Sequence, residues 1–183
     1  MWSYNFIFLD SQMGMRGFFG TVLLTILLSS NVSAQQKPIH EIYSMMMFNF
    51  IKYVQWPEEG ASEFVIGIVG NADILNTMNT YYKGNKIGTK TLVVRKIQTP
   101  ADADGCHVVF IDKTKSSEFD SYKNRVSGKS TLVITDKNGL GERGSGINFK
   151  VVDSKLKFEL NQKAIENAHL KVANSLSSMA ILI

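Results

Sequence analysis

The sequence predicts a three-layer α/β domain, in which helices flank a mixed β-sheet and the chain closes with a β-hairpin and a helix. Three observations predict this fold class. Continuous apolar runs at 64–70, 107–112 and 131–136 are typical of strands buried on both faces. Amphipathic segments separate these runs, as in a largely parallel sheet with helical crossovers. Two alternating runs at 147–152 and 156–159 follow, and they indicate an antiparallel hairpin.

Each element has its own signal in the chain. Apolar residues recur at spacings of three and four along the first expected helix, and Pro57 follows it. Asn161 is a helix-capping residue type and stands before the last expected helix. The expected helices are 39–55, 73–82, 116–126 and 161–179, and a further strand is expected at 91–97.

One glycine motif needs an interpretation. Residues 139–144 read GLGERG and match the GxGxxG pattern of dinucleotide-binding loops. Such a loop must open a helix, whose first amides receive the pyrophosphate. Here a strand-like run follows, so we expect a glycine-rich turn.

Length and net charge limit the number of domains and the kinds of partner that the chain can have. The chain has 183 residues, of which 44% are hydrophobic, so it can bury one domain core. Its net charge is +4 and its pI is near 9.1, without the concentrated basic stripe of nucleic-acid-binding proteins. We expect no nucleic-acid partner.

The N-terminal residues predict export. Arg16 precedes an apolar run at 18–28, and small residues ending at Ala34 follow it, which is the pattern of a cleavable signal peptide. We expect residues 1–34 to be removed and 35–183 to form a single periplasmic domain. Residues 1–14 add nothing to this pattern, so starts at Met13 or Met15 stay open. An uncleaved anchor is the alternative, although the run is shorter than a bilayer span.

Groups that carry chemistry are sparse. Cys106 is the only cysteine, so no internal disulfide can form. It stands beside His107, but neighbouring residues of a strand point to opposite faces, and the pair is not expected to act together. The three histidines have no metal-ligand spacing. We expect no catalytic residue, no metal and no cofactor.

The first helix carries apolar residues away from its expected core stripe. Met45 and Phe48 fall on the far face, together with charged residues, and Trp56 follows the helix. Exposed apolar residues commonly mark an interface. Met45, Phe48 and Trp56 are therefore candidates for contact with a partner or a second copy of the chain. The alternative is that another element covers this face.

Six short motifs follow one another along the expected mature domain. They are 43–57 (YSMMMFNFIKYVQWP), 64–70 (FVIGIVG), 105–111 (GCHVVFI), 132–136 (LVITD), 146–149 (GINF) and 157–161 (KFELN). In this order they resemble the YfiR/HmsC-like periplasmic proteins, and the closing segment with Leu170 and Leu176 also fits. The similarity extends over most of the expected mature domain.

The resemblance implies a non-enzymatic periplasmic α/β domain, often dimeric, that restrains an inner-membrane signalling protein. Implied partners are a diguanylate cyclase, whose product cyclic di-GMP promotes biofilm, or a sensor kinase. The alternative function is binding of a small ligand, a nucleotide or an aromatic amino acid, in a pocket near Trp56 and Asn148. An enzyme of an unrecognised type is the third class.

Two departures from the family pattern stand out. Redox-controlled members carry paired cysteines, and this chain has Cys106 alone, which makes a disulfide switch doubtful. Residues 167–170 read NAHL, whereas the family pattern has a glycine before the leucine. The departure puts any ligand contact made by that turn in doubt.

Overall fold

The computed structural model describes residues 37–57 and 60–183, and the span Lys37–Ile183 forms one compact unit. The expected signal peptide, 1–34, lies outside the described residues. The first half of the domain contains α2 (Ile39–Tyr53), β1 (Val54–Gln55), β2 (Glu63–Val69), α3 (Ala72–Tyr81), β3 (Lys86–Ile87), β4 (Lys90–Ile97), the 3-10 turn η1 (Pro100–Ala103) and β5 (Val108–Ile111). The second half contains the 3-10 turn η2 (Lys113–Glu118), α4 (Phe119–Arg125), β6 (Leu132–Thr135), β7 (Ile147–Val152), β8 (Lys155–Leu160), α5 (Gln162–Asn167), β9 (Lys171–Val172), α6 (Asn174–Met179) and β10 (Ile181–Leu182).

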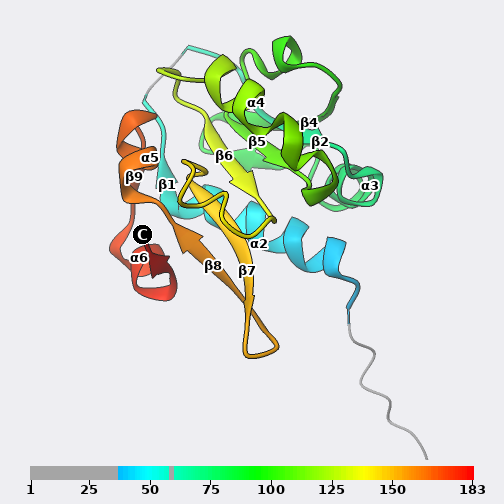
Figure 1. Ribbon diagram of the computed structural model, residues 1–183. Helices are drawn as coiled ribbons and strands as arrows, with labels where there is room; N and C mark the ends of the chain where they lie inside the picture. Colours follow the sequence, from blue (N-terminus) through cyan, green and yellow to red (C-terminus); the bar gives the residue numbers. More distant parts are fainter. Residues whose placement is uncertain (1–36, 58–59) are drawn as a thin grey trace, which may run out of the picture. The chain divides into compact units, whose positions relative to one another are not determined.

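Eight strands form the main sheet, in the order β10-β8-β7-β6-β5-β2-β4-β3 (Figure 1). The central strands β4, β2, β5, β6 and β7 run parallel to their neighbours within this set. β8 pairs antiparallel with β7, and β3 pairs antiparallel with β4. Numbered by their place in the chain, the parallel strands follow the order 2-1-3-4-5, as in doubly wound sheets of the flavodoxin type. The predicted α/β class with a mixed sheet is confirmed.

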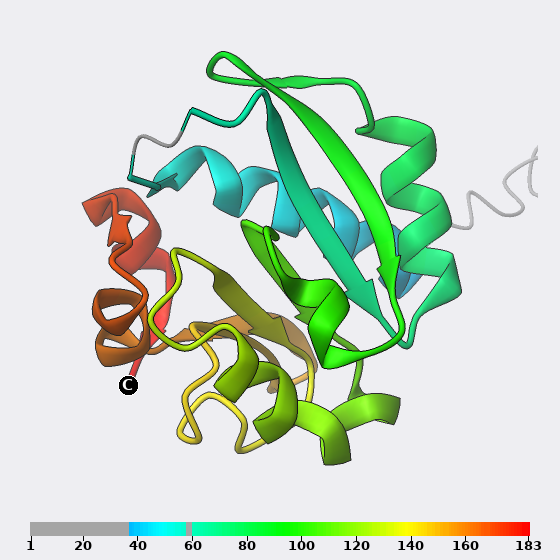
Figure 2. The same cartoon turned by 90° about the horizontal axis from the view of Figure 1, so that it is seen from above.

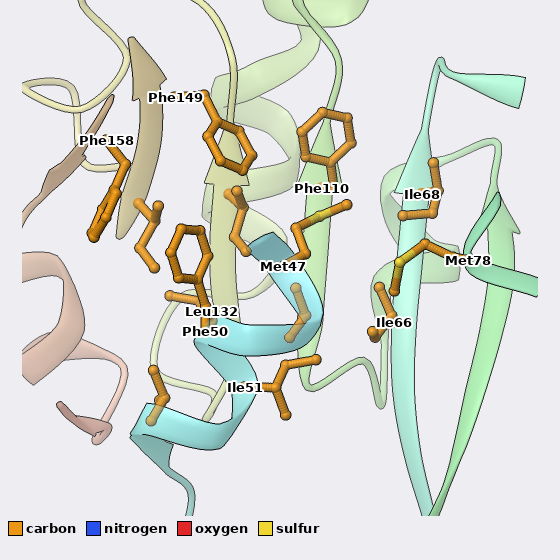
Figure 3. Close-up of a cluster of buried hydrophobic side chains, with 14 of the residues drawn as sticks. Met47, Phe50, Ile51, Ile66, Ile68, Met78, Phe110, Leu132, Phe149 and Phe158 are labelled. Carbon is orange, nitrogen blue, oxygen red and sulfur yellow. The ribbon is translucent and has the colours of Figure 1, made fainter. Parts of the chain in front are cut away.

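Apolar side chains cover both faces of the sheet. On one face, Met47 and Phe50 of α2 pack with Phe110, Phe149 and other strand residues (Figure 3). The opposite face carries a second cluster, which includes Phe119 of α4. Figure 2 shows α2 (cyan) and α4 (yellow-green) on opposite sides of the strands. The predicted three layers follow from this double burial.

The first helix ends two residues before its predicted limit. Val54 is already extended, and its N–H donates to the carbonyl of Phe50. Val54 and Gln55 then pair antiparallel with β9, with Val54 opposite Val172. A tertiary pairing with the far end of the chain therefore stops the helix before Pro57 does.

The predicted single helix 161–179 is wrong. Asn161 caps α5 as expected, accepting the N–H of Ala164 at 2.8 Å, but the helix ends at Asn167. His169 then has φ of 54°, in the left-handed region. Leu170 N–H donates to the Ile165 carbonyl at 3.1 Å, which is the bond that closes a Schellman motif. The family glycine before this leucine would suit that conformation.

Both turn expectations are confirmed. Asp153 and Ser154 join β7 to β8 with φ of 50° and 60°, as a tight hairpin turn requires. Residues 139–144 form consecutive turns ahead of β7 and open no helix. Gly139 and Gly144 have φ of 84° and 107°, a backbone conformation that glycine adopts more easily than other residues.

Replacing His169 by glycine should stabilise the domain. A side chain in the left-handed region carries a steric cost that glycine avoids, although glycine also gains freedom in the unfolded chain. We expect His169→Gly to raise the free energy of unfolding by about 0.5 kcal/mol, measured by urea denaturation. His169→Ala keeps the Cβ and is the control. An equal gain for both variants would contradict the conformational explanation.

Candidate functional site

The carboxyl ends of the parallel strands converge on a polar edge. The connection after β2 leads through α3 to β4, while the connection after β5 leads through η2 and α4 to β6 on the other side. The two connections therefore leave in opposite directions, which creates a crevice between the ends of β2 and β5. In open α/β sheets such a switch point is the usual place for a ligand.

Asn71 and Asp112 face each other across this switch point. Asn71 follows β2 and caps α3, where its Oδ1 accepts the N–H of Ile74 at 2.9 Å. Its Nδ2 donates to Asp112 Oδ2 at 2.7 Å. Asp112 follows β5 and also accepts from the N–H and hydroxyl of Thr114, at 2.9 and 2.6 Å. Burial alone would raise the pKa of Asp112, but the bonds from Asn71 and Thr114 outweigh it and lower the pKa.

Asp136 adds a second carboxyl group at the same edge, directly after β6. Burial and the charge of Asp112 raise its pKa to about 6, and one of its carboxyl oxygens has no hydrogen-bond partner among the described residues. Tyr43 of α2 lies over this end of the sheet and stacks on Phe149, with ring centroids 4.2 Å apart. Burial and the nearby Asp136 and Asp112 raise the pKa of Tyr43 to about 12. The edge therefore contains one ionised carboxylate, one carboxyl that titrates near neutrality and one neutral phenol.

A cavity of about 450 Å³ adjoins this edge, between the start of α3 and the η2–α4 segment. Its lining comes from the ends of β2 and β4 and from both segments. The residues that line it are Ile68, Val69, Gly70, Asn71, Ala72, Leu75, Lys96, Ile97, Gln98, Lys115, Glu118 and Tyr122. The volume lies in the range of small-ligand sites.

The comparison with known families gives a direct result. The family model described as YfiR/HmsC-like matches residues 40–181, nearly the whole described domain. The chain belongs to the YfiR/HmsC-like family. The resemblance noted in the sequence is thereby confirmed.

Two other comparisons add little to this assignment. No curated protein matches this YfiR/HmsC-like chain. Among solved structures, one described as a conserved domain protein from Vibrio cholerae O1 biovar El Tor is similar, with 12% identity and a TM-score of 0.49. The alignment covers 78% of this chain and 59% of that one. A similarity this low says nothing about function.

Trp56 lies at the opposite, amino end of the strands in this YfiR/HmsC-like domain. Its indole N–H donates to the carbonyl of His107 at 3.2 Å. Its ring meets Phe64 edge-on, with centroids 4.9 Å apart. His107 stacks on Phe64 and accepts the N–H of Val65 at 3.1 Å, while its other ring nitrogen lies 3.1 Å from the Lys90 ammonium. Trp56 is half-buried and closes this end of the core.

Asn148 is fully buried and belongs to a different polar network. Its Oδ1 accepts from the Thr135 hydroxyl at 2.7 Å, and its Nδ2 donates to Glu159 at 2.8 Å. Glu159 is itself buried and pairs with Lys150 at 2.5 Å. Every polar atom of the Asn148 side chain therefore already has a partner of opposite role.

The two residues named for the expected pocket, Trp56 and Asn148, lie in separate surroundings. Trp56 bonds next to the start of β5, whereas Asn148 pairs with Thr135 at the end of β6. Strands β5 and β6 are in register with Ile111 opposite Thr135, so His107 and this position lie four residues, or roughly 13 Å, apart along the strands. Their side chains also have separate partners. The structure does not bring Trp56 and Asn148 into one site.

The far face of α2 is partly covered. Phe48 is half-buried, stacks on Tyr82 at 4.5 Å, and has the Lys52 ammonium 4.5 Å from its ring centroid. The segment that follows α3 therefore covers Phe48, which is the alternative left open by the sequence. Met45 is 43% exposed. Of the three partner-contact candidates, Met45 alone is exposed, whereas Phe48 and Trp56 are half-buried.

Cys106 and His107 point to opposite sides of the sheet, as expected. Cys106 belongs to the cluster under α4, and His107 stacks on Phe64 of the cluster under α2. Burial raises the pKa of the Cys106 thiol, although Arg95 lies 3.6 Å from its sulfur. The thiol behaves as a packing group. Within residues 37–57 and 60–183, no three His, Cys, Asp or Glu residues gather to hold a metal ion.

The carboxyl-edge residues were not singled out from the sequence, although a signal was present. Asp112 and Asp136 each stand directly after an apolar strand run, in HVVFID and TLVITD. Parallel strands end at the same edge, so polar residues at these positions converge. What the sequence lacks is the strand order, which decides that β2, β5 and β6 are neighbours.

Asp136 should make stability depend on pH. Its folded pKa of about 6 exceeds the ordinary value of 3.8, so the folded state holds the proton to higher pH than the unfolded chain. The free energy of unfolding should therefore fall as pH rises from about 4 to about 6. Asp136→Asn should remove this fall. The free energy of unfolding of the variant minus that of the parent protein should be up to about 3 kcal/mol larger at neutral pH than at a pH near 4. Urea denaturation across this range measures it.

Asp153→Asn is the matched control, because Asp153 is exposed in the hairpin turn. It should leave the pH profile of the parent protein unchanged. Parallel profiles for Asp136→Asn and the parent protein would show that Asp136 carries no such penalty.

Asn148 should prove structural. Asn148→Leu keeps the branched shape of the side chain but removes one hydrogen-bond partner each from Thr135 and the buried Glu159, so we expect a loss of about 2–4 kcal/mol of unfolding free energy. Asn49→Leu, on the exposed side of α2, should change it by less than about 0.5 kcal/mol. Thermal and urea denaturation of both variants measure the effect. Equal small changes would mean that the Asn148 network contributes little.

Proposed function

We propose that this protein is an exported regulatory protein that restrains a membrane-bound signalling protein, such as a diguanylate cyclase or a sensor kinase, by contact in the periplasm. The observation that carries the proposal is the YfiR/HmsC-like match over residues 40–181. Proteins of this family act as regulators. The signal-peptide pattern that ends at Ala34 supports action outside the cytoplasm.

The surface of α2 supports a contact function. Ile39, Ile42, Met46 and Tyr53 recur at helical spacing and share one side of the helix. Ile39 and Tyr53 are 52% and 40% exposed, and Met45 lies beside them. We call these five residues the α2 flank. Ile42 and Met46 are half-buried, and Met46 also packs against the core, so the exposed members are Ile39, Met45 and Tyr53. Exposed apolar residues gathered on one helix are typical of an interface.

The mechanism we propose is a shift of population. A regulator that binds the inactive conformation of its partner more tightly than the active one raises the inactive fraction. Only differential affinity is needed, and no bond is made or broken. Within the described residues, no helix is long and apolar enough to cross a bilayer.

Met45→Ser separates a contact role from a folding role. Met45 is open, so the substitution should change the free energy of unfolding by less than about 0.5 kcal/mol, yet weaken association. Phe48→Ser loses its stacking on Tyr82 and should destabilise the domain by about 1–3 kcal/mol. The measurements are crosslinking in intact cells, identification of the membrane proteins recovered with the tagged full chain, and thermal denaturation of each variant.

Val151→Ser is the matched control, because Val151 is 65% exposed on the hairpin and outside the α2 flank. It should recover the same membrane partner in the same amount as the parent protein. Failure of the parent protein to recover any inner-membrane signalling protein would overturn the proposed function. If Met45→Ser recovered the membrane partner in an unchanged amount, the proposed function would stand, but the α2 flank would not be its contact surface.

A further inference from the structure

Two carboxyl groups occupy neighbouring positions of the sheet, under α2. The last residues of β5 and β6 are paired in register, and Asp112 and Asp136 follow them directly. Neighbouring strands are about 4.8 Å apart, and paired residues point to the same face of the sheet. Asp112 and Asp136 stand two positions after Phe110 and Ile134, which belong to the core cluster under α2. Side chains two positions apart share a face, so both carboxyl groups face α2.

Tyr43 is the residue of α2 that lies over these two groups. Its ring stacks on Phe149 with centroids 4.2 Å apart and lies 6.3 Å from the ring of Phe110. Figure 3 shows Phe110 and Phe149 together on the α2 side of the sheet. Burial and, after it, the charges of Asp136 and Asp112 raise the pKa of Tyr43 to about 12, so the phenol stays neutral beside them. The first half of α2 therefore packs where two negative charges can meet.

The structure satisfies the charge of Asp112 more fully than that of Asp136. Asp112 accepts hydrogen bonds from Asn71 at 2.7 Å and from the N–H and hydroxyl of Thr114 at 2.9 and 2.6 Å. Asp136 accepts from the backbone N–H of Lys113, but one of its oxygens is buried and has no hydrogen-bond partner within residues 37–57 and 60–183. Hydrogen bonds to the ionised form favour ionisation, and burial opposes it. Asp136 is therefore the member of the pair that takes up a proton first.

Charged groups of the surrounding elements leave this preference in place. Burial and then the charge of Asp112 raise the pKa of Asp136 to about 6, although Lys113 on the η2 side lowers it. α2 contributes the neutral phenol described above, and His40 stands one turn before it on the same side of the helix. The neighbouring position of β7 is aromatic and carries no charge, and Lys137, next in the chain, is exposed. As pH rises past about 6, Asp136 adds one negative charge beneath α2.

We propose that the protonation state of Asp136 controls how firmly the first half of α2 packs on the sheet. While Asp136 is protonated, the pair carries a single negative charge and α2 covers it. When Asp136 is ionised, the two carboxylates repel each other, and separating the start of α2 from the strand ends lets water solvate the second charge. The end of a helix opens at a cost far below that of unfolding the domain, so the sheet stays intact.

The consequence for regulation rests on the proposed function. The first half of α2 carries Ile39 and Met45, two exposed members of the α2 flank. A contact surface that is ordered in only a fraction of the molecules binds more weakly in proportion to that fraction. Restraint of the membrane partner should therefore be stronger below about pH 6 than above it.

Hydrogen exchange of the purified protein tests the packing of α2, with each amide rate divided by its intrinsic rate at the same pH. The amides of residues 43–46 donate to carbonyls of the first turn and should lose protection about tenfold between about pH 5 and about pH 7.5. The amides of β2 report unfolding of the whole domain and should stay better protected at both pH values. Asp136→Asn should show equal α2 protection at both pH values, whereas Asp153→Asn should behave like the parent protein.

Three results of this measurement would overturn the inference. The first is α2 protection that does not change with pH. The second is equal protection of α2 and β2 at each pH, because α2 would then open only with the whole domain. The third is a pH dependence that survives in Asp136→Asn, which would assign it to His40.

Crosslinking of the tagged full chain in intact cells, in media of about pH 5.5 and about pH 7.5, tests the consequence for the partner. The parent protein should recover about threefold more of the membrane partner at the lower pH, whereas Asp136→Asn should recover equal amounts. Recovery of no membrane protein at either pH would overturn the proposed function, and hydrogen exchange would still decide the role of Asp136. Equal recovery by the parent protein at both pH values would overturn the link between Asp136 and the partner.

Discussion

Burial of the central strands on both faces is the constraint on which the rest of the structure depends. All four residues of β5 are completely inaccessible to solvent, under α2 on one side and α4 on the other. Strands in this position cannot carry polar side chains without partners. Polar groups that keep an atom without a protein partner among the described residues therefore lie where the strands end or beside the sheet, and the parallel arrangement brings the strand ends to a single edge. Asp112 and Asp136 occupy that edge for this reason.

The same constraint separates two kinds of polar residue. Asn148 and Glu159 lie on strands inside the domain, so their atoms are saturated by one another and by Thr135 and Lys150. Asp136 and Tyr122 lie at the ends or flanks of the sheet, and each keeps an oxygen that has no hydrogen-bond partner in the described part of the chain. The first pair fixes how β6, β7 and β8 fit together. In the second pair, Asp136 keeps the capacity to bind a proton, since burial and the charge of Asp112 raise its pKa.

Local pattern was sufficient to predict much of the fold and little of the site. Strands β2, β5 and β6 and helix α2 each have a long apolar pattern. This pattern predicts the element whatever its neighbours in the fold. The two-residue strands β3, β9 and β10 have no such signal, because their pairing depends on neighbours distant in the chain. His169 could have indicated the break after α5, since the family glycine stands there. The cavity at Tyr122 could not be predicted, because it is the space left where β2, β4, α3 and α4 meet.

The pairing of Val54 with Val172 ties the beginning of the domain to its end. Contacts so distant in the sequence form slowly, because a long loop must close before they contribute any stability. A nascent chain that still lacks β9 cannot form the β1–β9 pair that follows α2. Under the proposed export, such late closure would keep the polypeptide unfolded while it crosses the membrane, and the domain would complete its fold only after its last residues arrive.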